Sequence, residues 1–263
     1  MGHQRLGSIP TTRKFDDLVG YLGGGSDVAL ADDTSSIARQ TLDAVQQGLS
    51  SAHHDYGLCY AFYLLSQIVL ASRESNWQAL LENVGIQISA ESSVFDFCAE
   101  VQNVLDDRIG SAGRRTDISE MAQQALGESL SCLAEPNAAT LFGRGQDELQ
   151  SALRQLSTKN GFARLGQKFF GLFTARYINF FLSRTTAAEV GGSRLNQLGD
   201  LTNFETALRL HCEQSAFIVR DFCGDWYAKT QFQEGIDLVN TTRFVAVAIK
   251  KLRNELKKQG AEL

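Results

Sequence analysis

The sequence predicts an all-α protein, an irregular bundle of about nine or ten helices around a buried, phenylalanine-rich central helix at residues 162–182. Three observations predict this class. Only two of the 263 residues are proline, which long helices exclude from their interiors. Apolar residues recur three and four positions apart along most of the chain, and no segment alternates as a half-buried strand does. Six of the sixteen phenylalanines lie within residues 162–182.

The first two predicted helices lie in the N-terminal fifth of the chain. The first begins at Thr11 or Thr12, where a hydroxyl can cap it. It ends at three consecutive glycines, because glycine permits any backbone angle and propagates no helix. The second runs from Asp27 or Thr34 to Leu49.

Four more helices are predicted in the middle of the chain. Residues 58–71 are apolar on nearly every side, so we expect this helix to be buried all round. A two-turn helix through Trp77 follows, and Gly85 ends it. Asp117 with Glu120 three residues later predicts a capping box at the start of a further helix. Between these, a helix that opens at Ser92 or Ser93 is predicted to bury one stripe of side chains: Val94, Phe95, Cys98, Val101, Leu105 and Ile109.

The predicted C-terminal helices cover residues 149–156, 162–182, 204–222 and 240–256. Residues 186–201 are rich in glycine, serine and asparagine, so we expect them to form a flexible connection. Gly224 is expected to end the third of these helices, and Asn240 or Thr241 to begin the last.

Residues 162–182 admit two interpretations. Gly166 and Gly171 permit neighbouring helices to approach closely, which favours a central core helix. Alternatively, the phenylalanines insert into a membrane while basic residues of the same stretch face lipid headgroups, which would make the protein a membrane-acting effector. The apolar residues cover too much of the circumference for a helix that lies half in water, so the sequence favours the core.

Charge is distributed unevenly along the chain. Residues 1–158 carry 10 Lys and Arg against 20 Asp and Glu, whereas residues 159–263 carry 15 against 10. We expect an acidic and a basic part of one continuous fold that attract each other or a neighbouring subunit. The net charge of −5 argues against a nucleic-acid partner, because non-specific phosphate binding requires a strongly basic domain.

The five cysteines are widely spaced and odd in number: Cys59, Cys98, Cys132, Cys212 and Cys223. Each lies in or beside an apolar periodic run, and no CxxC pair occurs. The pattern indicates reduced thiols in the core of a cytoplasmic protein.

One short pattern resembles an enzyme family. His54, Asp55, Tyr56 and Gly57 are similar to the His-Asp-x-Gly core of the HD-domain metal-dependent phosphohydrolases. The resemblance implies that His54 and Asp55 ligate a divalent metal ion that activates water for attack on phosphorus. That family also has an additional upstream histidine and a later aspartate. The structural alternative is that Asp55 caps the following helix and that the histidines lie on the surface.

Two arginine positions are candidates for binding an anion or a protein surface. Arg114 and Arg115 precede a predicted helix, and helix N-terminal amides and arginines together favour phosphate. Asp117 and Glu120 already occupy that helix end, which favours a solvated loop. Arg144, between two glycines, is a further candidate.

No coherent catalytic set emerges elsewhere. His211 and Cys212 are adjacent, but neighbouring helix side chains point about 100° apart, so the histidine is poorly placed to activate the thiol. We expect His211 to be a core or interface residue. No zinc-type ligand set can be assembled from the nearby acidic residues and thiols.

The strongest basic segment lies near the C-terminus. It contains Lys250, Lys251, Arg253, Lys257 and Lys258. We expect a non-catalytic helical subunit or adaptor of a larger intracellular assembly, which needs no cofactor and binds other subunits or a second copy through charged surfaces. The sequence argues against a membrane partner, since no uninterrupted apolar run is long enough to span a bilayer.

Overall fold

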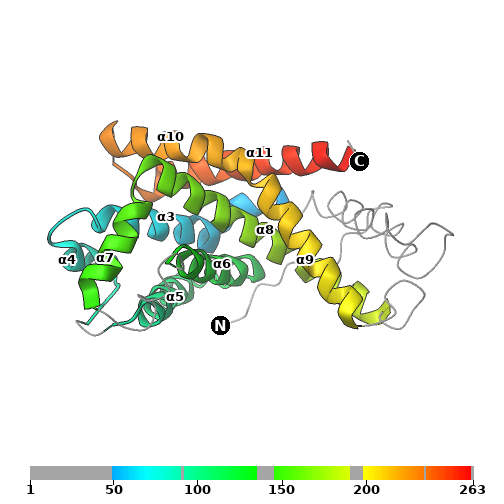
Figure 1. The fold of residues 1–263 in the computed structure, drawn as a ribbon, viewed down its shortest axis with the longest axis horizontal. Coiled ribbons are helices and arrows are strands. Elements are labelled where there is room, and N and C mark those ends of the chain that lie inside the picture. Colours follow the sequence, from blue (N-terminus) through cyan, green and yellow to red (C-terminus); the bar gives the residue numbers. More distant parts are fainter. Residues whose placement is uncertain (1–48, 90–91, 135–144, 190–197, 234, 262–263) are drawn as a thin grey trace.

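The computed structural model describes residues 49–89, 92–134, 145–189, 198–233 and 235–261. These residues form nine α-helices and one short 3-10 helix, and they contain no strand, so the predicted all-α class is confirmed. The elements, labelled as in Figure 1, are η1 (Ala52–His54), α3 (Tyr56–Ala71), α4 (Trp77–Asn83), α5 (Val94–Ser111), α6 (Asp117–Ala134), α7 (Gly145–Leu156), α8 (Lys159–Glu189), α9 (Leu198–Ser215), α10 (Phe217–Gln233) and α11 (Leu238–Ala261). The two helices predicted before Leu49 lie outside the described residues.

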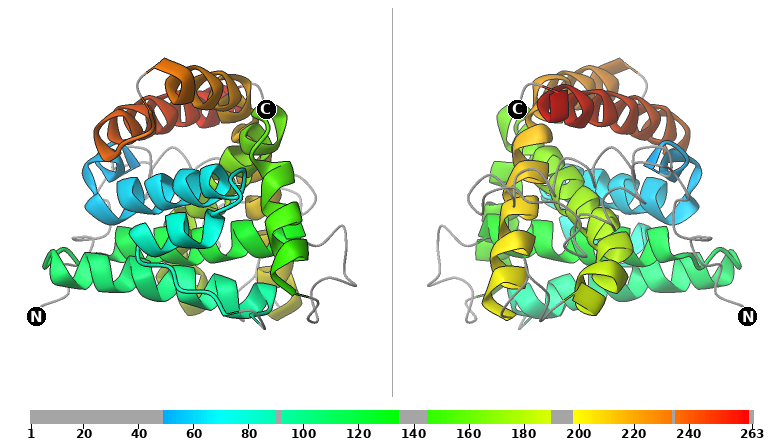
Figure 2. Two further views of the ribbon diagram at one scale, coloured as in Figure 1. Left: turned by 90° about the vertical axis from the view of Figure 1, so that its left-hand side faces the viewer. Right: turned by 90° about the vertical axis from the view of Figure 1, so that its right-hand side faces the viewer.

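The helices are stacked in layers. Helices α10 and α11 lie side by side along one face, α3 and α8 lie beneath them, and α6 and then α5 form the opposite face (Figures 1 and 2). Helices α7 and α9 run more steeply and close two sides of the stack (Figure 1). A single hydrophobic core runs through these layers and contains residues from both sides of residue 158.

Helix α8 is the centre of this core. It contacts α6, α7, α9 and α10. Phe162, Phe169, Phe170 and Phe173 have no exposed surface, which confirms the predicted buried, phenylalanine-rich helix. Phe180, nearer the C-terminal end, is 36% exposed. Because α8 continues to Glu189, it includes the first part of the stretch predicted as a flexible connection.

Two glycines allow α8 and α10 to cross closely. A Cβ atom on Gly166 would lie 2.5 Å from Sγ of Cys223, and one on Gly224 would lie 2.7 Å from the carbonyl oxygen of Lys159. The prediction that Gly224 ends a helix is therefore wrong, because this glycine lies inside α10 and serves the close approach.

The single helix predicted over residues 204–222 is two helices. The chain turns at Ala216, whose carbonyl accepts a hydrogen bond from the amide of Val219 in an i to i+3 turn (2.9 Å). The hydroxyl of Ser215 donates to the carbonyl of His211 (2.9 Å) at the end of α9. Both helices bury apolar residues on each side of this turn, so the apolar spacing continues through it.

Helix α5 begins as predicted, but it buries a different phenylalanine. Ser93 caps it in a capping box with Asp96. Phe95 is 52% exposed, so its prediction as a core residue is wrong, and Phe97, 1% exposed, takes that place. Val94 already lies on the buried face, and a residue one position later is rotated by about 100° away from it.

The starts of α6 and α11 also differ from prediction. Thr116, not Asp117, caps α6: its hydroxyl accepts from the amide of Ser119 (2.9 Å), and the hydroxyl of Ser119 accepts from the amide of Thr116 (2.9 Å). Helix α11 begins at Leu238, two residues before the predicted start. A reciprocal pair of hydrogen bonds between Asp237 and Asn240 explains the earlier start.

Candidate functional site

The His-Asp-x-Gly segment lies where the starts of two helices meet. Oδ1 of Asp55 accepts a hydrogen bond from the amide of Leu58 (3.0 Å) and so caps α3. Its Oδ2 accepts from the hydroxyl of Thr116 (2.6 Å), the residue that caps α6. A Cβ atom on Gly57 would collide with the side chain of Ser119, so this position permits α3 and α6 to cross. The predicted capping role of Asp55 is confirmed.

The surroundings of Asp55 differ from those of a metal ligand. His54 is exposed, and the ring of His53 lies 2.6 Å from the carbonyl oxygen of Ser50. Among the described residues, no group of three or more histidine, cysteine, aspartate or glutamate side chains is placed to hold a metal ion. Burial raises the pKa of Asp55 above its ordinary 3.8, although the hydrogen bonds from Thr116 and Leu58 oppose the shift.

The loop arginines have partners within the chain. Arg115 forms two hydrogen bonds of 2.5 Å with the carboxylate of Asp106. The guanidinium of Arg114 lies 5.4 Å from the ring centre of Tyr56, in a cation–π contact. Both interactions tie the loop between α5 and α6 to the helices beside it. Arg144 lies outside the described residues.

The thiols are buried rather than poised for reaction. Cys59, Cys98, Cys212 and Cys223 are free and buried, and the side chain of Cys132 is outside the described set. Burial raises the pKa of Cys212 and Cys223, and it raises that of Cys59 to about 11. Thiols with raised pKa values stay protonated at neutral pH and are poor nucleophiles.

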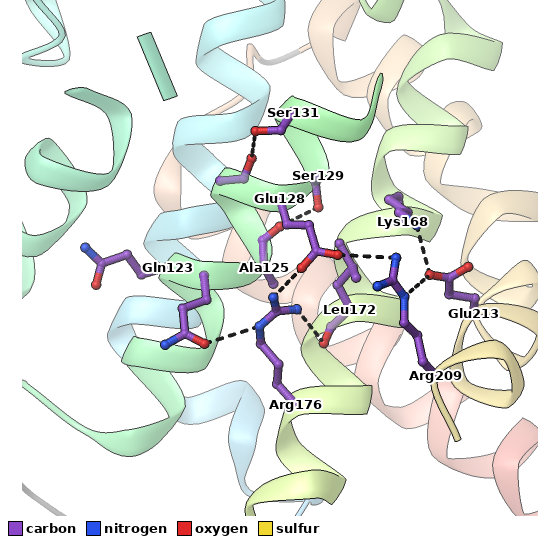
Figure 3. Close-up of polar contacts among 12 residues, drawn as sticks. Gln123, Ala125, Glu128, Ser129, Ser131, Lys168, Leu172, Arg176, Arg209 and Glu213 are labelled. Carbon is purple, nitrogen blue, oxygen red and sulfur yellow. Dashed lines mark hydrogen bonds and ion pairs between the residues drawn. The ribbon is translucent and has the colours of Figure 1, made fainter. Parts of the chain in front are cut away.

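Five charged side chains form a cluster where α6, α8 and α9 meet (Figure 3). Its members are Glu128, Lys168, Arg176, Arg209 and Glu213. Glu128 pairs with Arg176 and, at 3.3 Å, with Arg209. Glu213 pairs with Arg209 at 3.2 Å and with Lys168 at 2.8 Å. We call this set the charge cluster.

The charge cluster beside α9 lines part of a groove of about 320 Å³. Partial burial alone would raise the pKa of Glu213, but the hydrogen bonds from Lys168 and Arg209 outweigh it and lower the pKa below 4.5. Each cation of the cluster already has a carboxylate partner. The arrangement therefore fastens α9 to α6 and α8 and leaves no unpaired cation in the cluster for an anionic ligand.

The second surface groove lies between α10 and α11 and has a different chemistry. It measures about 450 Å³ and is lined by Phe222, Trp226, Lys229, Thr230, Gln233, Asn240, Arg243, Phe244 and Val247. Its base is aromatic: the ring centres of Trp226 and Phe244 lie 4.3 Å apart, in a stacked pair. Lys229 and Arg243 are exposed, one on each helix. We call this feature the α10–α11 groove.

Further cations lie along the same face. Nζ of Lys251 lies 4.8 Å from the ring centre of Phe222. Lys250 and Lys258 are exposed and Arg253 is half-buried, while the side chain of Lys257 is outside the described set. By sequence, α11 carries six lysines and arginines against one acidic residue. Helix α11 is therefore strongly basic where it borders the aromatic floor of the groove.

Sequence reasoning found the basic segment of this face but missed the groove. The predicted basic residues all lie beyond the groove's lining, whereas Trp226, Lys229 and Arg243 were not singled out. A signal was present, because Phe222 and Trp226 lie four residues apart and Phe244 and Val247 three apart, the spacing of a helix face.

No family model, curated protein or solved structure matches this chain. Within the part of the chain that the structure describes, no helix is both long and apolar enough to cross a membrane.

Proposed function

We propose that the protein is a non-catalytic helical subunit or adaptor that binds an acidic protein surface through the α10–α11 groove. The observation that carries the proposal is the combination of an aromatic base with exposed cations on both sides, Lys229 on α10 and Arg243 on α11. The proposal includes a cytoplasmic location. The free, buried thiols of the chain support this location.

The two kinds of groove residue would act differently in binding. Aromatic side chains such as Trp226 give up much apolar surface on contact and commonly provide most of the affinity of an interface. Exposed cations at the rim attract an acidic partner and set its orientation, with an effect that falls as salt screens the charges. A partner with carboxylates around one or two apolar residues would complement both.

The two other functions considered from the sequence receive less support. Both oxygens of the Asp55 carboxylate accept hydrogen bonds that serve the two helix starts, and among the described residues no group of three or more metal-ligating side chains includes it, so the metal-dependent phosphohydrolase has less support. A membrane-acting role for α8 needs its phenylalanines outside, yet Phe169, Phe170 and Phe173 are inside the core.

Tryptophan fluorescence can test the groove directly. The chain has two tryptophans, and Trp77 is buried in the core, so a change on ligand addition reports Trp226. An acidic peptide with one phenylalanine should change the emission at low salt and bind less tightly at high salt. The variant Lys229→Glu with Arg243→Glu should weaken binding by about tenfold or more, whereas Arg164→Glu, an exposed change on α8, should not. Equal affinity for both variants would remove the groove from the proposal.

A further inference from the structure

The face opposite the α10–α11 groove has the complementary chemistry. Helix α5 carries four acidic residues and a single arginine, Arg108. That arginine is exposed, and its guanidinium lies 5.9 Å from the ring centre of Tyr60 in α3. Helix α5 therefore carries a net negative charge.

Four exposed residues of α5 follow one helical stripe that contains no cation. Asp96, Ala99, Asn103 and Asp107 are all exposed and recur at intervals of three and four residues. Phe95 lies beside Asp96 and is itself about half exposed. This surface, which we call the α5 face, is an acidic helix side with a small residue near its middle and an aromatic ring at its edge.

The α5 face and the α10–α11 groove are complementary in shape as well as in charge. The groove between two helices is the kind of surface that accepts a third helix through its apolar anchors. Phe95 can contact the aromatic base formed by Phe222, Trp226 and Phe244, while Asp96 and Asp107 face the cations of the rim. Complementary charge of this kind favours one partner and one orientation.

We propose, resting on the function proposed above, that the acidic partner of the groove is the α5 face of a second copy of this chain. The two surfaces lie on opposite sides of the helix stack (Figures 1 and 2). One pair of molecules therefore cannot exchange the two contacts reciprocally around a two-fold axis. The contact is heterologous, and copies add head to tail into a ring or an open row.

A mixing experiment tests this arrangement. One variant loses the groove charges through Lys229→Glu and Arg243→Glu, and the other loses the α5 face through Phe95→Ser and Asp107→Lys. All four positions are exposed, so both variants should stay folded, which circular dichroism and thermal melting verify. Sedimentation velocity then compares the wild-type chain, each variant alone and the equimolar mixture, at low and at high salt.

The wild-type chain should form concentration-dependent oligomers at low salt, and each variant alone should associate at least about tenfold more weakly. The mixture should recover association but stop at a one-to-one complex, because only one intact groove and one intact α5 face meet. A monomeric wild-type chain at low salt, undiminished association of either variant, or a mixture without complex would each overturn the proposal. If the wild-type chain is monomeric and the acidic peptide still binds near Trp226, this inference fails while the proposed function stands; if the peptide does not bind either, both fail.

Discussion

Asp55 joins the beginnings of two helices with one carboxylate. Its two oxygens accept hydrogen bonds from the amide of Leu58 in α3 and the hydroxyl of Thr116 before α6. The sequence predicted the first of these contacts, because an aspartate before an apolar helix is a common cap. It could not predict the second, which joins residues 61 positions apart.

The raised pKa of Asp55 makes its contribution to stability depend on pH. The folded pKa lies above the unfolded value of 3.8, so between the two the folded state binds more protons. The free energy of unfolding therefore falls as pH rises through this window. Asp55→Asn removes the titration, so the stability of the variant relative to wild type should increase as pH rises from about 3.8. Urea unfolding at a series of pH values measures this difference.

Asp96 provides a control of opposite sign. Its hydrogen bonds with Ser93 lower its pKa, so its contribution is present above 3.8 and is lost as pH falls through the folded pKa. Asp96→Asn should therefore lose stability relative to wild type as pH rises. If Asp55→Asn also loses stability relative to wild type as pH rises, the pKa of Asp55 is not raised.

Among the elements, α8 is the centre of the core. Phe170→Ala removes a fully buried ring in contact with Phe62 and Phe169, and it should lower the free energy of unfolding by about 3–5 kcal/mol. Phe180→Ala, at a partly exposed position of the same helix, should cost less than about 1 kcal/mol. Urea denaturation gives both values. Similar losses at the two positions would contradict a core centred on the first half of α8.

Ion pairs attach helix α9 to the helices beside it. Glu128 on α6 pairs with Arg176 of α8 and Arg209 of α9, so Glu128→Gln should loosen α9 from α6 (Figure 3). Because the cluster is partly solvated, the loss of global stability should be small, about 1 kcal/mol or less. Hydrogen exchange should instead show reduced protection in α9. Glu82→Gln, at an exposed position of α4, should leave α9 protection unchanged, and equal exchange in both variants would argue against this role.

The spacing of apolar residues predicted that these helices exist. It predicted less well which side of each helix is buried and where each helix ends. Phe95 and Phe97 are equally apolar in sequence, and only the packing of α5 on α6 decides which one is buried. The turn at Ala216 interrupts no apolar repeat, because both α9 and α10 bury residues there. The glycine expected to stop a helix, Gly224, instead admits the backbone of α8.

Across the whole molecule, the charge imbalance was predicted from the sequence and the groove was not. The imbalance between the two parts of the chain is a matter of counting. The α10–α11 groove, by contrast, arises from two antiparallel helices whose aromatic residues meet only in the fold, with Trp226 stacked on Phe244. The segment that contains Trp226 and Lys229 had no predicted element at all.

The continuous core predicts one unfolding transition for the acidic and basic parts. Trp77 in α4 and Trp226 in α10 report these two parts separately, because the chain has no other tryptophan. Urea curves of Trp77→Phe and Trp226→Phe, each compared with its own circular dichroism, should show fluorescence and helix loss at the same midpoint. A fluorescence transition that precedes the loss of helix in either variant would indicate two independently unfolding parts.

The crossing of α8 and α10 turns one native side chain into a reporter of motion. Sγ of Cys223 lies against Gly166, where the two helices touch, and it is fully buried. An alkylating reagent can reach this thiol only when the helices separate, so its rate of modification measures how often they do. The alkylation rate of Cys223 therefore reports, without any added label, how often α8 and α10 separate.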